Sequence, residues 1–172
     1  MSTAGTSPSP PGRGRSLVAF CGWLLLCYAF AALGALASVN AQSFYGEIAR
    51  PSWAPPGWVF GPVWSVLFTA MAFAAWLAWR TPPGIARTRA LWLFVAQLGF
   101  NALWSWLFFG WHRGGWALAE LLVMWASIAA TLLAFRGIQR TAAWLMAPYL
   151  AWVSFAGYLN FVLWRMNPGL LG

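Results

Sequence analysis

Five long apolar stretches, separated by short polar turns, make up most of the chain. Each has about the 20 residues that a helix needs to cross a hydrocarbon core of roughly 30 Å. Lipid offers no partner for backbone N–H and C=O groups, so stretches of this kind must be helical. The pattern therefore predicts an all-α membrane protein, a bundle of five transmembrane helices. The predicted spans are residues 17–39, 59–79, 90–111, 116–135 and 142–164.

The remaining residues divide the chain into three parts. Residues 1–16 are rich in Ser, Pro and Gly, a composition that predicts a disordered N-terminal segment. Residues 17–167 form one predicted domain, and residues 168–172 are a short tail. Connections within the domain are short except for the first, residues 40–58, in which Pro55 and Pro56 stiffen the approach to the second span.

Composition agrees with a membrane protein. Hydrophobic residues make up 62% of the chain and charged residues only 7%, whereas about 25% of the residues in a soluble domain are charged. A water-soluble globular enzyme and a disordered protein are therefore excluded. The net charge of +8 comes from arginines scattered in ones and twos between apolar runs. Such scattering forms no basic stripe, so we expect no nucleic-acid partner.

The arginines are divided unequally between the two sides of the predicted bundle, with seven on one side and three on the other. Cytoplasmic loops carry an excess of basic residues, so the count predicts a cytoplasmic N-terminus and an outward-facing first loop. Seven arginines share the N-terminal side (Arg13, Arg15, Arg80, Arg87, Arg89, Arg136 and Arg140), and three share the other (Arg50, Arg113 and Arg165).

Residues that could carry acid–base or metal chemistry are few. The chain has one histidine, His112, and two carboxylates, Glu47 and Glu120, and they do not cluster. Neither a metal site nor a nucleophile–base pair can be assembled from them. Glu120 lies about one turn inside the fourth predicted span, where its carboxylate can reach water or Arg113. This shallow depth favours an interfacial anchor over a proton relay.

Most of the 15 tryptophans fall into two sets. Trp64, Trp104, Trp125 and Trp152 lie inside the predicted spans, where a buried indole N–H needs a hydrogen-bond partner. The others lie mostly at span ends, where an aromatic belt at the headgroups is the ordinary explanation. The belt comprises Trp53, Trp58, Trp79, Trp92, Trp111, Trp116, Trp144 and Trp164.

Three polar or aromatic side chains of the third span, Gln97, Asn101 and Trp104, share one helical stripe. Asn101 and Trp104 lie at the same predicted depth as Trp64 and Trp152, beneath the first loop. One interpretation is an aromatic cavity for a flat, largely apolar polycyclic ligand, covered by that loop. The alternative is that these side chains only hold the helices together.

Several motifs resemble those of the TspO/MBR family, the tryptophan-rich sensory or translocator proteins. The resemblance covers residues 45–167. It rests on PSWAPP at 51–56, GPVW at 61–64, QLGFN at 97–101 and PYLAW at 148–152, continuing through LN at 159–160 to WR at 164–165.

The resemblance implies a five-helix bundle, usually a homodimer in the lipid bilayer, that binds porphyrins and haem, benzodiazepine-type ligands and, in some members, sterols. It implies no required cofactor. A sterol partner is the weakest of these expectations, because Phe161 stands where the family's sterol pattern has tyrosine. The ligand-binding residues that the resemblance implies are Tyr45, Trp64, Phe68, Asn101, Trp104, Trp152 and Ala156.

Three functions are compatible with these residues. The first is tetrapyrrole binding for transport, sequestration or sensing. The second is light-dependent porphyrin breakdown, which some bacterial relatives are held to perform with tryptophans matching Trp64 and Trp152. The third is a structural or regulatory role without a small-molecule ligand.

Overall fold

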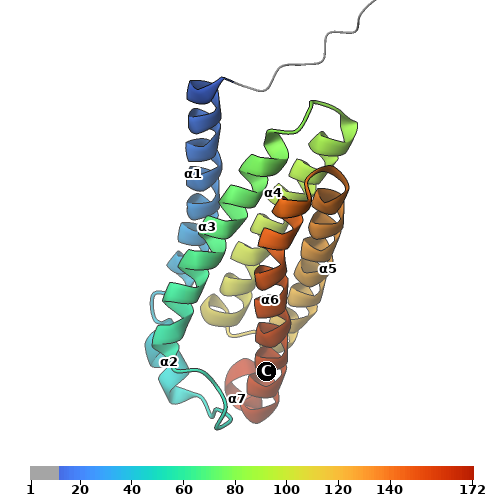
Figure 1. Ribbon diagram of the computed structural model, residues 1–172. Coiled ribbons are helices and arrows are strands. Elements are labelled where there is room, and N and C mark those ends of the chain that lie inside the picture. Colours follow the sequence, from blue (N-terminus) through green and yellow to red (C-terminus); the bar gives the residue numbers. More distant parts are fainter. Residues whose placement is uncertain (1–11) are drawn as a thin grey trace, which may run out of the picture.

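The computed structural model describes residues 12–172 and contains five helices that are long and apolar enough to cross a membrane. They lie side by side and alternate in direction (Figure 1). The predicted five-helix bundle is confirmed. The last two helices extend beyond their predicted spans at both ends, whereas the first and third begin and end earlier than predicted. These helices are α1 (Arg13–Ala37), α3 (Phe60–Trp79), α4 (Ile85–Ser105), α5 (Gly114–Ile138) and α6 (Arg140–Met166).

The first helix begins earlier than expected. Residues 13–16 belong to α1 rather than to the predicted disordered segment, because no proline beyond Pro11 opposes helix formation before Pro51. Residues 1–11 of that predicted segment lie outside the described residues.

The core lies among α3, α4, α5 and α6. Alanines of α3 such as Ala72 and Ala75 are fully buried and pack in one cluster with large side chains from the other helices, including Phe94 and Phe135. In α1, by contrast, only Cys27 and Gly34 are buried. The first helix therefore lies at the side of the bundle, where it can form one wall of a space between helices.

Two short elements fill the long first connection. The segment contains a helix, α2 (Ala41–Glu47), and a turn of 3-10 helix, η1 (Gly57–Val59). We call residues 40–58 the lid, because they lie across the end of the bundle near the C-terminus (Figure 1). The segment after residue 167, expected as a short tail, is one helical turn, α7 (Pro168–Leu171), with Leu171 fully buried.

The end of α4 departs from regular geometry. Its last turn widens into a π-helix, η2 (Trp106–Gly110), and the chain then turns through His112, whose φ is +53°. Single π-helical turns often occur at functional sites. Here the turn places Phe109 beside the lid residue Phe44, with ring centroids 6.4 Å apart.

Candidate functional site

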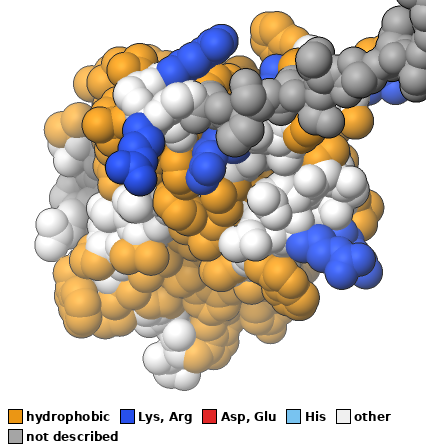
Figure 2. Space-filling model, turned by 45° about the horizontal axis from the view of Figure 1, so that its top comes forward, with side chains coloured by type: hydrophobic (Ala, Val, Ile, Leu, Met, Phe, Trp, Pro, Cys, Tyr) orange, Lys and Arg blue, Asp and Glu red, His pale blue; other side chains and the backbone are white. Residues whose placement is uncertain are grey.

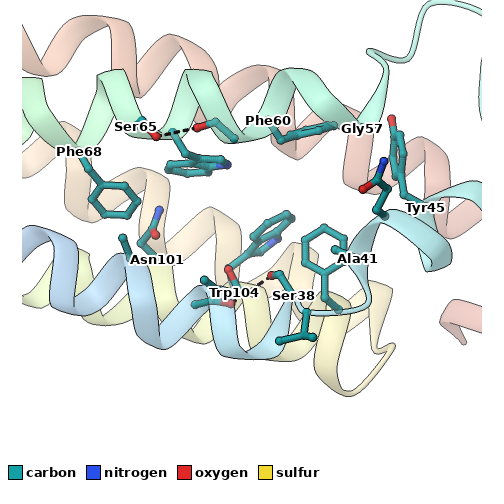
Figure 3. A pocket seen from close by; sticks show the side chains of 18 of the residues that line it. Ser38, Ala41, Tyr45, Gly57, Phe60, Ser65, Phe68, Asn101 and Trp104 are labelled. Atoms are coloured by element: carbon teal, nitrogen blue, oxygen red, sulfur yellow. Dashed lines mark hydrogen bonds between the residues drawn. The ribbon is translucent and has the colours of Figure 1, made fainter.

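A cavity of about 460 Å³ lies beneath the lid, between α1, α3 and α4. Its volume is within the usual range for small-molecule sites. In Figure 3, Phe60, Ser65 and Phe68 lie on one side of the space and Asn101 and Trp104 on the other. The aromatic lining residues come from α1, α2, α3, α4 and η2, and they are Tyr28, Tyr45, Phe60, Trp64, Phe68, Trp104 and Phe109.

Five of the seven sequence-predicted ligand residues line this cavity. They come from the lid (Tyr45), α3 (Trp64 and Phe68) and α4 (Asn101 and Trp104). The structure thus brings together residues that lie up to 59 positions apart in the sequence.

The two predicted residues of α6, Trp152 and Ala156, do not line the cavity. The Trp152 ring packs edge-on against Phe60, with centroids 5.8 Å apart, so Phe60 stands between Trp152 and the space. The indole N–H of Trp152 is buried and has no hydrogen-bond partner within residues 12–172. Trp152 therefore lies behind Phe60 and does not form part of the cavity wall.

Asn101 and Trp104 line the cavity and also join helices. The Asn101 amide nitrogen donates to the Tyr149 hydroxyl (3.1 Å), and the Trp104 indole nitrogen donates to Asn160 Oδ1 (3.1 Å). Because these bonds engage the Asn101 amide nitrogen and the Trp104 indole nitrogen, the Trp104 ring is held in one orientation against the cavity. The two interpretations of the polar stripe are therefore compatible.

The lining residues of α1 were not foreseen from the sequence. Tyr28 donates a hydrogen bond to the Ser65 carbonyl (3.2 Å) and lies 3.0 Å from the Thr69 hydroxyl. Ala35 and Ser38 line the cavity about two and about three turns further along. The only available signal was the spacing of small residues in the first span, which predicts close packing but not a cavity wall.

The cavity opens sideways between α1 and α3. Ala35 on α1 and Gly61 and Ser65 on α3 line it, and all three are exposed. The exposed surface of spanning helices faces lipid, so this opening faces the bilayer rather than water.

The lid is fastened to the bundle at three places. Asn167, at the end of α6, accepts a hydrogen bond from the Ala49 N–H (2.8 Å) and donates one to the Ala49 carbonyl (2.9 Å). Phe44 stacks on His112 with ring centroids 4.3 Å apart, and Trp53 stacks on Tyr158 at 5.3 Å. These contacts fix both halves of the lid to the bundle.

Tyr45 joins the lid to the cavity. Its ring lines the space, its hydroxyl donates to the Pro55 carbonyl (3.1 Å), and the Arg50 guanidinium lies 4.7 Å from the ring centre. Burial raises the pKa of Tyr45 above its ordinary value, and the nearby Arg50 offsets part of this effect. The phenol is therefore neutral at physiological pH and available as a donor.

This pKa direction predicts an alkaline loss of stability. The unfolded chain ionises Tyr45 at about pH 10, whereas the folded protein resists ionisation, so the stabilisation is lost as pH rises from about 10 through the raised pKa. We expect the free energy of unfolding to fall more steeply over this range in the wild type than in Tyr45→Phe. Tyr158→Phe, at an exposed tyrosine, is the control and should behave as the wild type; equal slopes in all three would contradict the assignment.

Glu120 does not make the contact expected of it. Both carboxylate oxygens are buried and have no hydrogen-bond partner among the described residues, so the predicted approach to Arg113 is wrong. Its side chain turns toward the protein because lipid on the outer surface would be a worse environment for it. Residues 12–172 contain no group of three potential metal ligands.

Comparison with known proteins places the chain among membrane proteins of this architecture. The family model "TspO/MBR family" matches residues 23–165. The chain is 40% identical to the human translocator protein over 131 residues, which cover 75% of this chain and 78% of the relative. It is 39% identical to the tryptophan-rich sensory protein of Cereibacter sphaeroides over 149 residues, 84% of this chain and 92% of the relative. A protein of Chlorobaculum tepidum, the tryptophan-rich protein TspO, is 37% identical over 158 residues, 88% of this chain and 96% of that relative. With five membrane-spanning helices and these matches over most of its length, the chain belongs to the TspO/MBR family.

Proposed function

We propose that this protein binds a flat tetrapyrrole of the porphyrin or haem type in the cavity beneath the lid, and that binding serves transport, sequestration or sensing of that ligand. The observation that carries the proposal is the aromatic lining of a cavity within the membrane-spanning bundle. Stacking on aromatic faces suits a planar, largely apolar ring system. Benzodiazepine-type ligands, which are also flat and apolar, would occupy the same space.

Polar groups around the lining would orient such a ligand. Asn101, Gln42 and Ser105 contribute amide and hydroxyl groups to the cavity, enough to pair with a few polar substituents at the ring edge. The described lining residues include no His, Cys or Met, and the hydroxyls of the two lining tyrosines, Tyr28 and Tyr45, are engaged in hydrogen bonds within the protein. Binding would therefore depend on stacking more than on axial coordination of a metal, so free-base protoporphyrin and haem should bind with similar affinity.

Tryptophan fluorescence provides the test. We expect protoporphyrin IX in the dark to quench the wild type saturably and Trp64→Ala to weaken the affinity by about tenfold, since it removes a stacking face from the cavity wall. The control is Trp125→Ala, because Trp125 lies outside the cavity and bonds to Ser154 (2.8 Å). Equal porphyrin affinities of Trp64→Ala and Trp125→Ala would contradict the assignment of the cavity as the binding site. No saturable quenching at all would favour the structural or regulatory role.

Light-dependent porphyrin breakdown is a second use of the same cavity. Its supporting observation is the position of Trp64 in the wall, where an oxidisable indole would lie beside an excited porphyrin. Repeating the titration under illumination in air tests it. Loss of the porphyrin absorption spectrum only in light, and more slowly in Trp64→Phe, would support breakdown. A spectrum that is stable in light would indicate binding without breakdown.

We also propose that the protein is a homodimer with a cytoplasmic N-terminus, on the grounds of the family membership and the arginine count. Cross-linking in the bilayer tests the homodimer. Labelling of a cysteine introduced before α1 tests the cytoplasmic position of the N-terminus.

A further inference from the structure

One end of the bundle, where α1, α4 and α6 begin and α3 and α5 end, carries most of the arginines. We call it the arginine end. Figure 2 tilts this end toward the reader and shows blue side chains spread around it, with no red among them. The arginine end comprises Arg13, Arg15, Arg80, Arg87, Arg89, Arg136 and Arg140.

No carboxylate side chain balances this charge. The chain has only two. Glu47 belongs to α2 in the lid, at the opposite end, and the Glu120 oxygens are buried six residues from the start of α5, also toward the opposite end. The C-terminus lies at that opposite end as well (Figure 1). The arginine end therefore has no acidic partner within the chain.

Two of these seven arginines make contacts with other described residues of the protein. Arg87 donates hydrogen bonds to the carbonyls of Trp79 (3.1 Å) and Thr81 (2.9 Å), closing the end of α3. Arg80 lies over the Trp76 ring at 4.7 Å. Arg89, Arg136 and Arg140 project from helix termini and are exposed, as are Arg13 and Arg15 in the first turn of α1.

The helix termini at the arginine end leave a net partial positive charge, because three helices begin there and two end there. None of the three helix starts has an acidic residue in its first turn or a side-chain cap. Arg136 lies in the last turn of α5, next to partial charge of the opposite sign, whereas Arg13, Arg15 and Arg140 lie at helix starts, next to charge of their own sign. An anion from outside the chain would reduce this repulsion.

We propose that the arginine end binds the phosphates of anionic phospholipids in the adjacent leaflet, in preference to zwitterionic phospholipids. The positions fit, because these arginines lie at the ends of membrane spans, at the level of the headgroups. The side-chain type fits as well, since a guanidinium binds phosphate through two parallel hydrogen bonds. Basic side chains next to a bilayer attract anionic lipid in this way. The inference is independent of what the cavity binds.

The test uses the full chain in nanodiscs made of equal amounts of phosphatidylglycerol and phosphatidylcholine, followed by native mass spectrometry of the lipids that remain bound. We expect phosphatidylglycerol to be enriched several-fold in the wild type. The double variant Arg136→Gln/Arg140→Gln should lose at least about half of this enrichment. The matched control, Arg113→Gln/Arg165→Gln at the opposite end, should retain it.

Two further measurements make the result decisive. High sodium chloride should reduce the enrichment of phosphatidylglycerol in the wild type, because exposed charges are screened by salt. This measurement uses only the wild type, so it does not depend on the folding of any variant. Sodium phosphate at the same ionic strength should reduce it no more than chloride does. Equal binding of the two lipids, equal loss in both double variants, or selective displacement by free phosphate would each overturn the proposal. A far-UV circular dichroism spectrum and thermal unfolding curve equal to those of the wild type serve as the control that both double variants are folded.

Discussion

Replacing Asn167 with alanine should free the lid, so that backbone amides of residues 44–54 exchange with solvent deuterium about 10 to 100 times faster than in the wild type. Asn167 is only 7% exposed and makes both hydrogen bonds to Ala49. Each bond contributes about 0.5–1.5 kcal/mol, so losing both favours the open lid by about 1–3 kcal/mol, and 1.4 kcal/mol corresponds to a factor of ten.

A graded variant distinguishes loss of the bonds from loss of packing. Asn167→Asp keeps an acceptor for the Ala49 N–H but has no donor for the Ala49 carbonyl, so its exchange rate should fall between those of the wild type and the alanine variant. The amides of α5 should be unaffected in both variants. If Asn167→Asp and Asn167→Ala exchange at the same rate as the wild type, the stacking contacts of Phe44 and Trp53 alone hold the lid.

Asn160→Leu should produce the largest loss of stability. The Asn160 side chain is 1% exposed, accepts from the Trp104 indole and donates to the Gly114 carbonyl (2.9 Å), so one amide joins α4, α5 and α6. Leucine fills a similar volume but removes both hydrogen bonds, and it leaves the part-buried Trp104 indole N–H without its acceptor. A lost bond contributes about 0.5–1.5 kcal/mol and an unsatisfied donor costs about 1–3 kcal/mol, so we expect the free energy of unfolding to fall by about 2–4 kcal/mol.

Unfolding in mixed micelles of increasing dodecyl sulfate content measures this loss. Asn40→Leu makes the same chemical change at an exposed asparagine whose backbone carbonyl, not its side chain, accepts from Ser43, and it should unfold as the wild type does. Porphyrin affinity should also fall in Asn160→Leu, because Trp104 is no longer fixed. A stable variant with normal affinity would show that the Trp104 ring is held by packing alone.

The spans could be predicted because their signal is a property of composition and length, which the bilayer imposes on any helix that crosses it. The placement of Trp64 and Asn101 at one depth followed from counting residues from each span end. Depth alone does not determine rotation about the helix axis. For this reason Trp152, at the right depth on α6, lies behind Phe60 instead of in the cavity.

Rotation was hardest to predict for α1. Its apolar residues are spread around the whole helix, so no periodicity marks Tyr28 or Ser38 as lining residues. The π-helical turn η2 and the inward direction of Glu120 depend on neighbouring helices in the same way. Both are results of tertiary packing that a single span does not encode.

The sideways opening between α1 and α3 changes what an affinity means for this protein. A ligand reaching Ala35 and Gly61 comes from the bilayer, and an apolar ligand partitions there far more strongly than it dissolves in water. The thermodynamic activity of the ligand at the site is then set by its mole fraction in the lipid and not by its total concentration in the sample. Doubling the lipid in a titration dilutes such a ligand and raises the apparent dissociation constant expressed as total ligand per volume of sample, although no contact in the cavity has changed. Affinities of this protein should therefore be compared only at equal lipid concentration.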